Sequence, residues 1–354
     1  MTILYVLNNI MDFKGGCHYF RAFLPGLALR ELGHNVIEVT ANYKDWDGIL
    51  KGVDVVMFQR MYGVNINDLI EKIKKKKIRI AYDIDDDIWN VPVGNPASKG
   101  NTAATYQIEN LLRIADVVTT TTPRLKKLLD KFNDNVMVVP NAVDISRYDG
   151  DKRENNLPIV VYSGSASHWQ DFLEILPTLR DVKKDIPFHF VLQGFTQESL
   201  EAAMFMYAKL AAWGIIEPGS EYQRVALKCW DYLKDMNVLH IPFYPPEMYP
   251  MILRSINADI GICPLEDNLF NKSKSCIKFY EYASSDIVTL APNLEPYNTE
   301  VGLTYNGLTD FKNKLKNLII NKKERYNNLY EQKRWVKNNR DINKITKLWE
   351  KALS

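Results

Sequence analysis

The segment at 271–292, NKSKSCIKFYEYASSDIVTLAP, combines cations, hydroxyls and one carboxylate ahead of an apolar run. Ser275 is placed to cap a helix, whose first turn would carry Lys274, Ser275 and Lys278. Free backbone amides, the positive end of a helix dipole and two ammonium groups bind anions, phosphate above all. A solvated amphipathic helix without a ligand shows the same pattern, so the rest of the chain has to decide between the two.

A second group of candidates follows other apolar runs. In YDIDDDIW at 82–89, Asp85 and Asp86 belong to a cluster of carboxylates that could chelate a cation, act as a base, or merely cap the next segment. Neighbouring residues of an extended chain point to alternate sides, so we favour a role facing a cleft, near an acceptor, and predict no metal site. His18 and His168 each fall in a predicted loop, where an imidazole can hold or move a proton.

The loop after the first apolar run carries glycines. Gly15 and Gly16 allow a backbone to approach a ligand closely, and Arg21, near the start of the helix that follows, is predicted to bind the same ligand. The sequence has no GxGxxG fingerprint with an acidic residue about 20 positions later, and no GxxxxGK[ST] motif. A dinucleotide site is therefore disfavoured and a P-loop nucleotidase is excluded.

The elements that must position these residues are apolar runs of strand length alternating with helical patterns. The first set lies at 3–7, 35–40, 53–58, 78–82, 116–120 and 136–139, and the second at 159–163, 188–192, 238–241, 258–263 and 287–291. Such alternation predicts doubly wound parallel sheets, whose ligands bind at the carboxyl ends of the strands. The polar stretch at 148–158 is typical of a linker. We therefore predict an α/β protein of two Rossmann-like domains facing across a cleft.

Composition excludes several classes of protein. The 354 residues are 46% hydrophobic and carry a formal net charge of only +2, which does not favour a general nucleic-acid binder, although the run at 71–79 is strongly basic. The four cysteines form no CxxC pair, which disfavours zinc and disulfide frameworks and fits a reducing cytoplasm. No signal peptide precedes the first strand and no apolar run approaches the roughly 20 residues of a membrane span. Membrane contact would be peripheral.

Five motifs in order carry a resemblance over the full chain: KGGCHYFRAFLPGLALRELGHNV, YDIDDDIW, VVPNAVDISRY, VVYSGSASHWQDF and KSKSCIKFYEYASSDIVTLAP. Together they resemble the retaining family 4 (group 1) glycosyltransferases of GT-B fold, and most closely a microbial and phage branch with a DxDDD segment. The resemblance implies a nucleotide-diphosphate sugar as donor, a UDP-sugar first, and no metal or other cofactor. It implies domains at 1–150 for the acceptor and 151–330 for the donor, with the helix at 331–354 crossing back.

The resemblance also assigns residues to the donor. Gly15 and Gly16 match the glycine-rich loop against the donor diphosphate and sugar. Gly164 and Ser165 belong to the loop over the donor phosphates, where the Arg and Lys pair of the family is absent and His168 stands nearby.

The most specific match is in the last motif. Glu281 matches the second glutamate of the paired-glutamate motif, which holds the ribose hydroxyls, while Ser273 occupies the place of the first. Lys274, Ser275 and Lys278 would then contact the diphosphate. The family implies retention by a front-face mechanism, in which the leaving phosphate helps to deprotonate the acceptor.

The acceptor is the least determined partner. A saccharide or related small molecule is favoured by the near-neutral charge, and modified DNA bases become a candidate if the chain comes from a phage. Lys74 to Lys77 could recruit an anionic membrane surface or a nucleic acid, or could be a solvated helix end. Two alternatives of other classes are a degenerate GT-B subunit that binds without turnover, motivated by Ser273, and a nucleic-acid-binding protein.

Overall fold

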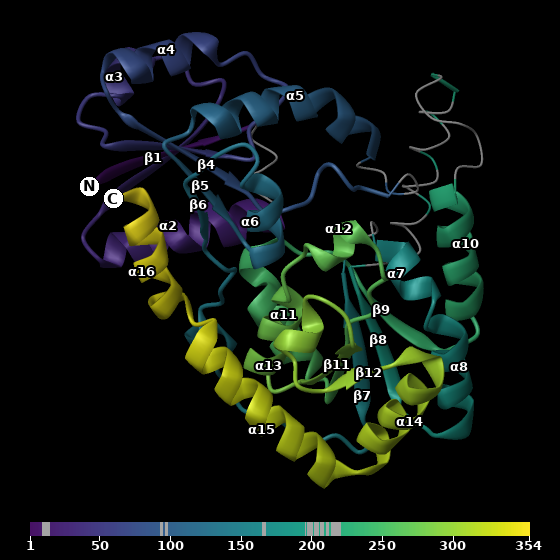
Figure 1. Cartoon of the computed structure of the whole chain (residues 1–354). Coiled ribbons are helices and arrows are strands. Elements are labelled where there is room, and N and C mark those ends of the chain that lie inside the picture. Colours follow the sequence, from purple (N-terminus) through teal and green to yellow (C-terminus); the bar gives the residue numbers. More distant parts are fainter. Residues whose placement is uncertain are drawn as a thin grey trace.

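The computed structural model describes residues 1–8, 15–92, 95, 98–164, 168–194, 196, 201, 205, 209, 212–213 and 221–354. In this part of the chain the strands form two six-stranded sheets, and every strand pair is parallel. Figure 1 shows the two sheets in separate lobes, each flanked by helices. The predicted fold class, two Rossmann-like domains of α/β type, is confirmed.

The first sheet has the order β2-β1-β3-β4-β5-β6. Its strands are β1 (Thr2–Leu7), β2 (Asn35–Thr40), β3 (Val55–Gln59), β4 (Arg79–Ile84), β5 (Val117–Thr120) and β6 (Val136–Val138). Its helices are α1 (Gly16–His18), α2 (Leu24–Glu31), α3 (Trp46–Ile49), α4 (Asn67–Lys75), α5 (Ser98–Ile114) and α6 (Pro123–Leu129), with a π-helical turn η2 (Tyr19–Phe23) between α1 and α2.

The second sheet has the order β12-β11-β10-β7-β8-β9. Its strands are β7 (Ile159–Ser163), β8 (His189–Gln193), β9 (Val238–Ile241), β10 (Ile260–Ile262), β11 (Val288–Pro292) and β12 (Thr304–Tyr305). Its helices are α7 (Trp169–Leu173), α8 (Leu176–Asp185), α10 (Glu221–Leu233), α11 (Tyr249–Ile256), α12 (Leu269–Lys272), α13 (Ile277–Ser284), α14 (Gly307–Ile320) and α15 (Lys322–Asn339). The short 3-10 turns are η3 (Ile145–Tyr148), η5 (Pro246–Met248) and η6 (Tyr297–Thr299).

Each sheet is buried on both faces because helices cover both. Along β1, Leu4 and Val6 belong to one hydrophobic core, and the alternate residues Ile3 and Tyr5 belong to another on the opposite face. Side chains of a strand alternate between faces, so a strand covered on both sides reads as a continuous apolar run. This explains why the strands could be located from the sequence to within about two residues, the two-residue strand β12 excepted.

The chain passes between the domains twice. The first passage is the segment from η3 to β7, and the second is the junction of α15 with α16 (Ile342–Leu353), where Ile342 N donates to Val143 O at 2.9 Å. Helix α16 then packs against α2 with Ile345 and Trp349 buried in the first domain. Figure 1 shows both chain termini at this lobe.

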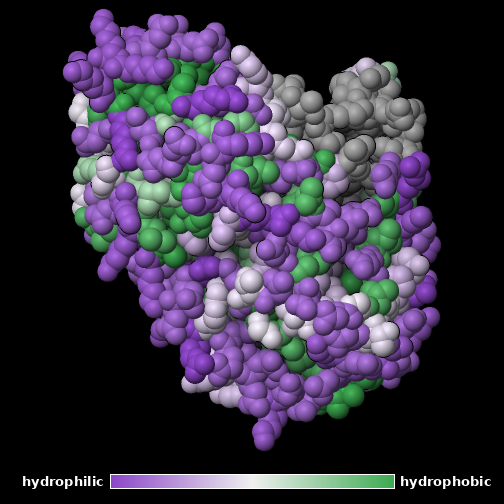
Figure 2. Space-filling view, in the orientation of Figure 1, coloured by the Kyte–Doolittle hydropathy of each residue, from purple (hydrophilic) through white to green (hydrophobic). Residues whose placement is uncertain are grey.

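In the described part of the chain, every helix is too short or too polar to cross a lipid bilayer. In the space-filling view, hydrophilic residues cover most of this face of both domains, and apolar residues lie in small separate patches (Figure 2). The basic residues Lys74 to Lys77 are exposed at the end of α4.

Candidate functional site

The two domains meet where the strands of each sheet end. Thr122 Oγ1, two residues after β5, donates to Ser273 O at 3.0 Å. Ser273 Oγ donates to Asp87 Oδ2 at 3.3 Å, and Asn141 Nδ2 donates to Ser275 Oγ at 2.8 Å. Polar groups at the carboxyl ends of both sheets therefore converge, which is where ligands of open parallel sheets bind.

His168 lies at this junction, directly before α7. Its Nδ1 is 2.8 Å from Asp171 Oδ2, and the other oxygen of Asp171 accepts from Glu266 N at 2.9 Å and Asn271 Nδ2 at 2.7 Å. Burial and the positive charges of Lys278 and Lys274 lower the pKa of His168 to about 4. A carboxylate only accepts hydrogen bonds, so the neutral imidazole carries its hydrogen on Nδ1 and a lone pair on Nε2.

Lys274 and Lys278 form a cationic pair beside this histidine. Nζ of Lys274 lies 4.6 Å from the ring centre of Phe270, and Nζ of Lys278 lies 6.0 Å from that of Tyr162. Among the described residues, neither ammonium has a carboxylate within salt-bridge distance. Burial lowers the pKa of Lys278, and the neighbouring charge of Lys274 lowers it further. Two like charges held together, with no carboxylate of the described residues in direct contact, attract an anion such as a diphosphate.

Glu281 lies on the same helix as Lys278, in the buried part of α13. Burial raises its pKa to about 8, although the charge of Lys278 and a hydrogen bond from Tyr148 act in the opposite direction. Oη of Tyr148 is 3.3 Å from Oε1 of Glu281. The carboxyl group is therefore mostly protonated near neutral pH in the unliganded protein.

The predicted cap of α13 is wrong. The helix begins at Ile277 after Cys276, which makes no side-chain cap, and Ser275 instead accepts the hydrogen bond from Asn141. Lys278 is in the first turn as predicted, whereas Lys274 precedes the helix. The tertiary partner from the first domain competes for the hydroxyl that local sequence alone would assign to the cap.

The carboxylates of the first domain surround a guanidinium. Arg60 Nη1 lies 2.9 Å from Asp86 Oδ2 and 3.8 Å from Asp85 Oδ1. Burial raises the pKa of Asp85, as does the charge of Asp86, while Arg60 opposes them. Oδ1 of Asp85 is buried and makes no hydrogen bond to any described residue, so it has unused capacity to accept one. Arg60, which sequence reasoning missed, adopts a left-handed backbone with φ of 45°.

A metal ion has one candidate group in the described part of the chain. Cys17, Asp85 and Asp86 each offer a ligand atom, and these atoms lie within 4.8 Å of one another. Arg60 Nη1 is 3.6 Å from the sulfur of Cys17 and 2.9 Å from a carboxylate oxygen of Asp86. The guanidinium thus already supplies positive charge to Cys17 and Asp86. That the protein needs no metal ion here stays a prediction.

His18 is buried in the first domain and pairs with a strand residue. Its Nε2 is 2.7 Å from Glu38 Oε2. Gly15 directly precedes α1, and a Cβ added at Gly16 would meet nothing within 4 Å, so protein packing does not require glycine at that position. Open space beside a glycine suits a ligand that approaches the backbone. Nothing in the sequence around Glu38, in β2, indicates that it pairs with His18.

Arg21 is not available for the donor, contrary to the sequence prediction. It is fully buried and ion-paired with Asp83 at 2.7 Å, donates to Val139 O at 2.7 Å, and lies 4.6 Å from the ring of Trp349. It also donates to Asn141 Oδ1 at 3.1 Å, and Asn141 holds Ser275. Arg21 therefore positions a residue of the domain junction instead of touching a ligand.

Gly164 and Ser165 are the remaining predicted donor residues. Gly164 directly follows β7. Its carbonyl oxygen lies where a side chain at Gly194 would be, and Gly194 has a φ of 91°. Ser165 lies outside the described residues. The structure thus brings together His168, Lys274, Ser275, Lys278 and Glu281, and it places Asp85, Asp86 and His18 on the first domain.

Comparison with known proteins identifies the fold. No family model and no curated protein matches the sequence. An alpha-glucosyltransferase solved with UDP has a TM-score of 0.67 at 14% identity, covering 100% of this chain and 99% of that one. The Anabaena protein HepE, solved with UDP and glucose, has a TM-score of 0.65 at 12% identity with the same coverage. A UDP-forming trehalose-phosphate synthase from Burkholderia vietnamiensis has a TM-score of 0.62 at 11% identity, again covering 100% and 99%.

The chain has the GT-B fold. Full coverage in both directions means that both domains and their connection match, not a single Rossmann-like half. In GT-B terms, the cationic pair and Glu281 belong to the second domain, and the Arg60 carboxylate cluster belongs to the first.

Proposed function

We propose that the protein is a glycosyltransferase that moves a sugar from a nucleotide-diphosphate sugar, first a UDP-sugar, to an acceptor. The observation that carries the proposal is the cationic pair of Lys274 and Lys278, held next to His168 and Glu281 where the carboxyl ends of both sheets meet. The solved structures of the same fold support it, because several of them contain UDP or a UDP-sugar analogue.

Departure of the diphosphate creates the largest change of charge in such a transfer. The transition state resembles an oxocarbenium ion, and negative charge grows on the leaving oxygen. Lys274 and Lys278 supply positive charge without a metal. Binding of the diphosphate also removes the repulsion between the two ammonium groups, and it restores the pKa of Lys278 toward its ordinary value.

Glu281 and His168 act on the uncharged parts of the donor. The protonated carboxyl of Glu281 enters the complex without a desolvated charge and can both accept from and donate to the ribose hydroxyls. His168 presents the lone pair of Nε2, because Asp171 holds the hydrogen on Nδ1. A neutral acceptor of this kind suits a sugar hydroxyl and not a phosphate oxygen.

The first domain holds the acceptor in this proposal. Oδ1 of Asp85 accepts a hydrogen bond from a hydroxyl group of the acceptor, and Asp86 keeps Arg60 in place. His18, fixed by Glu38, follows Gly15 and Gly16, which in this proposal lie against the donor sugar. Transfer proceeds with retention and without a metal, and the leaving phosphate removes the acceptor proton.

The acceptor is a saccharide or a related small molecule. Modified DNA is the second candidate, because one solved structure of the same fold, an alpha-glucosyltransferase, contains UDP and a 13-mer DNA with an HMU base. The exposed lysines at 74–77 lie at the end of α4, which Figure 1 places at the outer end of the first lobe and away from the domain junction. They are therefore poorly placed to hold an acceptor at the donor.

A panel of UDP-, GDP-, ADP- and dTDP-sugars tests the proposal by thermal shift and slow donor hydrolysis. We expect one donor to stabilise the wild type and to be hydrolysed, and both effects to be lost in Lys278→Ala and Glu281→Ala. Lys347→Ala, on the exposed side of α16, is the matched control. Donor binding without hydrolysis or transfer to any acceptor would favour the degenerate binding subunit. Equal melting of all variants with every donor would refute both.

A further inference from the structure

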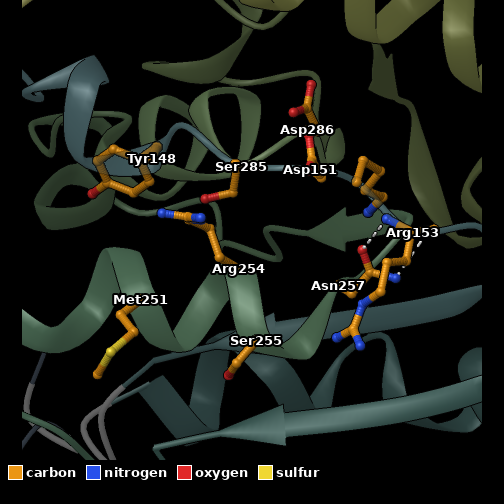
Figure 3. Close-up of a pocket in the computed structure, with 11 residues that line it drawn as sticks. Tyr148, Asp151, Arg153, Met251, Arg254, Ser255, Asn257, Ser285 and Asp286 are labelled. Carbon is orange, nitrogen blue, oxygen red and sulfur yellow. Dashed lines mark hydrogen bonds between the residues drawn. The ribbon is translucent and has the colours of Figure 1, made fainter.

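A separate cavity of about 310 Å³ lies beside the segment that joins the two domains. Its walls come from Gly150 and its neighbours in that segment, from Met251 and Arg254 on α11, and from Ser285 after α13 (Figure 3). The segment precedes β7 and Ser285 precedes β11, so the cavity is at the amino ends of these parallel strands. Lys274 and Lys278 lie at the opposite edge of the sheet.

Arg254 brings an unpaired cation to this cavity. Among the described residues, its guanidinium has neither an acidic partner nor a hydrogen bond. It lies against Gly150, where an added Cβ would be 1.9 Å from an Arg254 terminal nitrogen. Glycine at 150 therefore leaves the space that the guanidinium occupies.

Ser285 supplies an unused hydroxyl at the same place. The residue is 7% exposed, and its buried Oγ has no hydrogen-bond partner in the part of the chain that the structure describes. Figure 3 shows this hydroxyl and the guanidinium of Arg254 pointing toward each other in the cavity. A buried hydroxyl without a partner is unfavourable, and an oxygen of a ligand between the two side chains would satisfy both.

The charges around the cavity are positive in sum, because Lys152, Arg153 and Arg254 line it together with Asp151 and Asp286, and this attracts an anion. Asp286, which also lines the cavity, is neutralised by Lys333 at 2.5 Å. Lys152 donates to the carbonyl of Ala258. Asp151 is exposed, as Lys152, Arg153 and Arg254 are, so solvent screens these charges alike.

We propose that this cavity binds a small phosphate monoester, with the phosphate oxygens held by Arg254 and Ser285. Guanidinium and hydroxyl donors are the groups that recognise phosphate. The volume corresponds to about ten water molecules, which exceeds what a phosphate group alone fills. Met251 and the ring of Tyr148 offer apolar wall to the carbon chain of the ester.

The ester also influences the donor site, a step that rests on the proposed function. Tyr148 lines the cavity, and its hydroxyl donates to Glu281. A ligand that packs against the Tyr148 ring holds the hydroxyl in place and thereby fixes Glu281. We expect the bound ester to lower the KM for the nucleotide sugar at least threefold.

Calorimetric titration with glycerol 3-phosphate tests the site on the full chain, with glycerol and inorganic phosphate as comparison probes. We expect saturable binding of the ester by the wild type, about tenfold weaker binding by Arg254→Gln and Ser285→Ala, and no binding of glycerol. Lys278→Ala, which alters the donor site, binds the ester as the wild type does. Arg113→Gln is the matched control for loss of a surface arginine.

Several results would overturn the assignment. One is no binding of the ester at about 10 mM. Another is binding that survives Arg254→Gln but is lost in Lys278→Ala, because the phosphate would then occupy the donor site. Equal affinity for inorganic phosphate would refute the ester as ligand. These titrations need no sugar transfer, so their outcome is independent of the nucleotide-sugar panel. If Arg254→Gln folds poorly, Ser285→Ala still tests the site.

Discussion

Asn141 Nδ2 donates to Ser275 Oγ at 2.8 Å, across the boundary between the two domains. The same amide accepts from Arg21, which is ion-paired with Asp83. A continuous polar chain thus runs from the core of the first domain to the residue that precedes the predicted donor helix. It links the closure of the domains to the geometry around the cationic pair.

Breaking that link should affect the donor more than the fold. In Asn141→Ala, Ser275 loses its donor partner, and we expect the KM for the nucleotide sugar to rise about threefold to tenfold, since a neutral hydrogen bond contributes about 1 kcal/mol. The kcat should change less. Steady-state kinetics over a donor titration measure this. A fall in kcat with an unchanged KM would contradict the role of the link in closure.

Arg21 should matter chiefly for stability. Arg21→Met leaves Asp83 as a buried charge without its partner, so we expect the free energy of unfolding to fall by about 3–5 kcal/mol. The double variant with Asp83→Asn should recover much of this loss, because the second change removes the unpaired charge. Urea denaturation measures both. Arg113→Met, at a side chain that is 50% exposed, should cost about 1 kcal/mol or less.

Glu281 should impose a pH dependence on the unliganded protein. Its pKa of about 8 lies above the ordinary value of 4.5, so the folded protein holds a proton that the unfolded chain releases. The resulting contribution to the free energy of unfolding is complete below about pH 4.5 and is lost as the pH rises toward 8. The total loss is a few kcal/mol. Urea denaturation between pH 5 and 9 should show a shallower dependence for Glu281→Gln. Parallel curves for the two proteins would refute the assignment.

The tautomer of His168 should control donor binding. In Asp171→Asn, the oxygen of the new amide can still accept from Glu266 and Asn271, while its NH2 group faces Nδ1 and moves the histidine hydrogen to Nε2. The lone pair on Nε2 is lost, and we expect kcat/KM to fall about 10-fold to 100-fold with little change in Tm. His168→Gln, whose amide oxygen accepts hydrogen bonds, should retain more activity than His168→Phe. Equal activity of these two variants would contradict a role as acceptor.

Chelation should leave transfer unchanged. Arg60 provides positive charge to Asp85 and Asp86, and the two lysines of the second domain provide it to the leaving group. We therefore expect EDTA to leave kcat/KM unchanged, and Cys17→Ser to do the same. Restoration of a chelated protein by Mg²⁺ or Mn²⁺ would show that Cys17, Asp85 and Asp86 hold a metal after all.

The sequence by itself determined the two parallel sheets, because strands covered on both faces are continuous apolar runs, and such runs need no knowledge of distant residues. It also located Lys274, Lys278 and Glu281, which are close in sequence and share one helix or its entrance. Ser273 and the DxDDD segment were visible as well, but not the contact between Ser273 and Asp87.

Only the tertiary structure decided which polar groups pair across long separations. Arg21 reads as a ligand contact from its place near a helix start, yet Asp83 and Asn141 surround it in the core. Burial and the charges of Lys278 and Lys274 keep His168 neutral, and Asp171 then fixes its hydrogen on Nδ1, neither of which a short loop motif can show. Likewise, Arg254 and Ser285 share a cavity only because the linker passes both. Such charges and hydroxyls acquire their roles from burial and partners, which depend on how the domains pack.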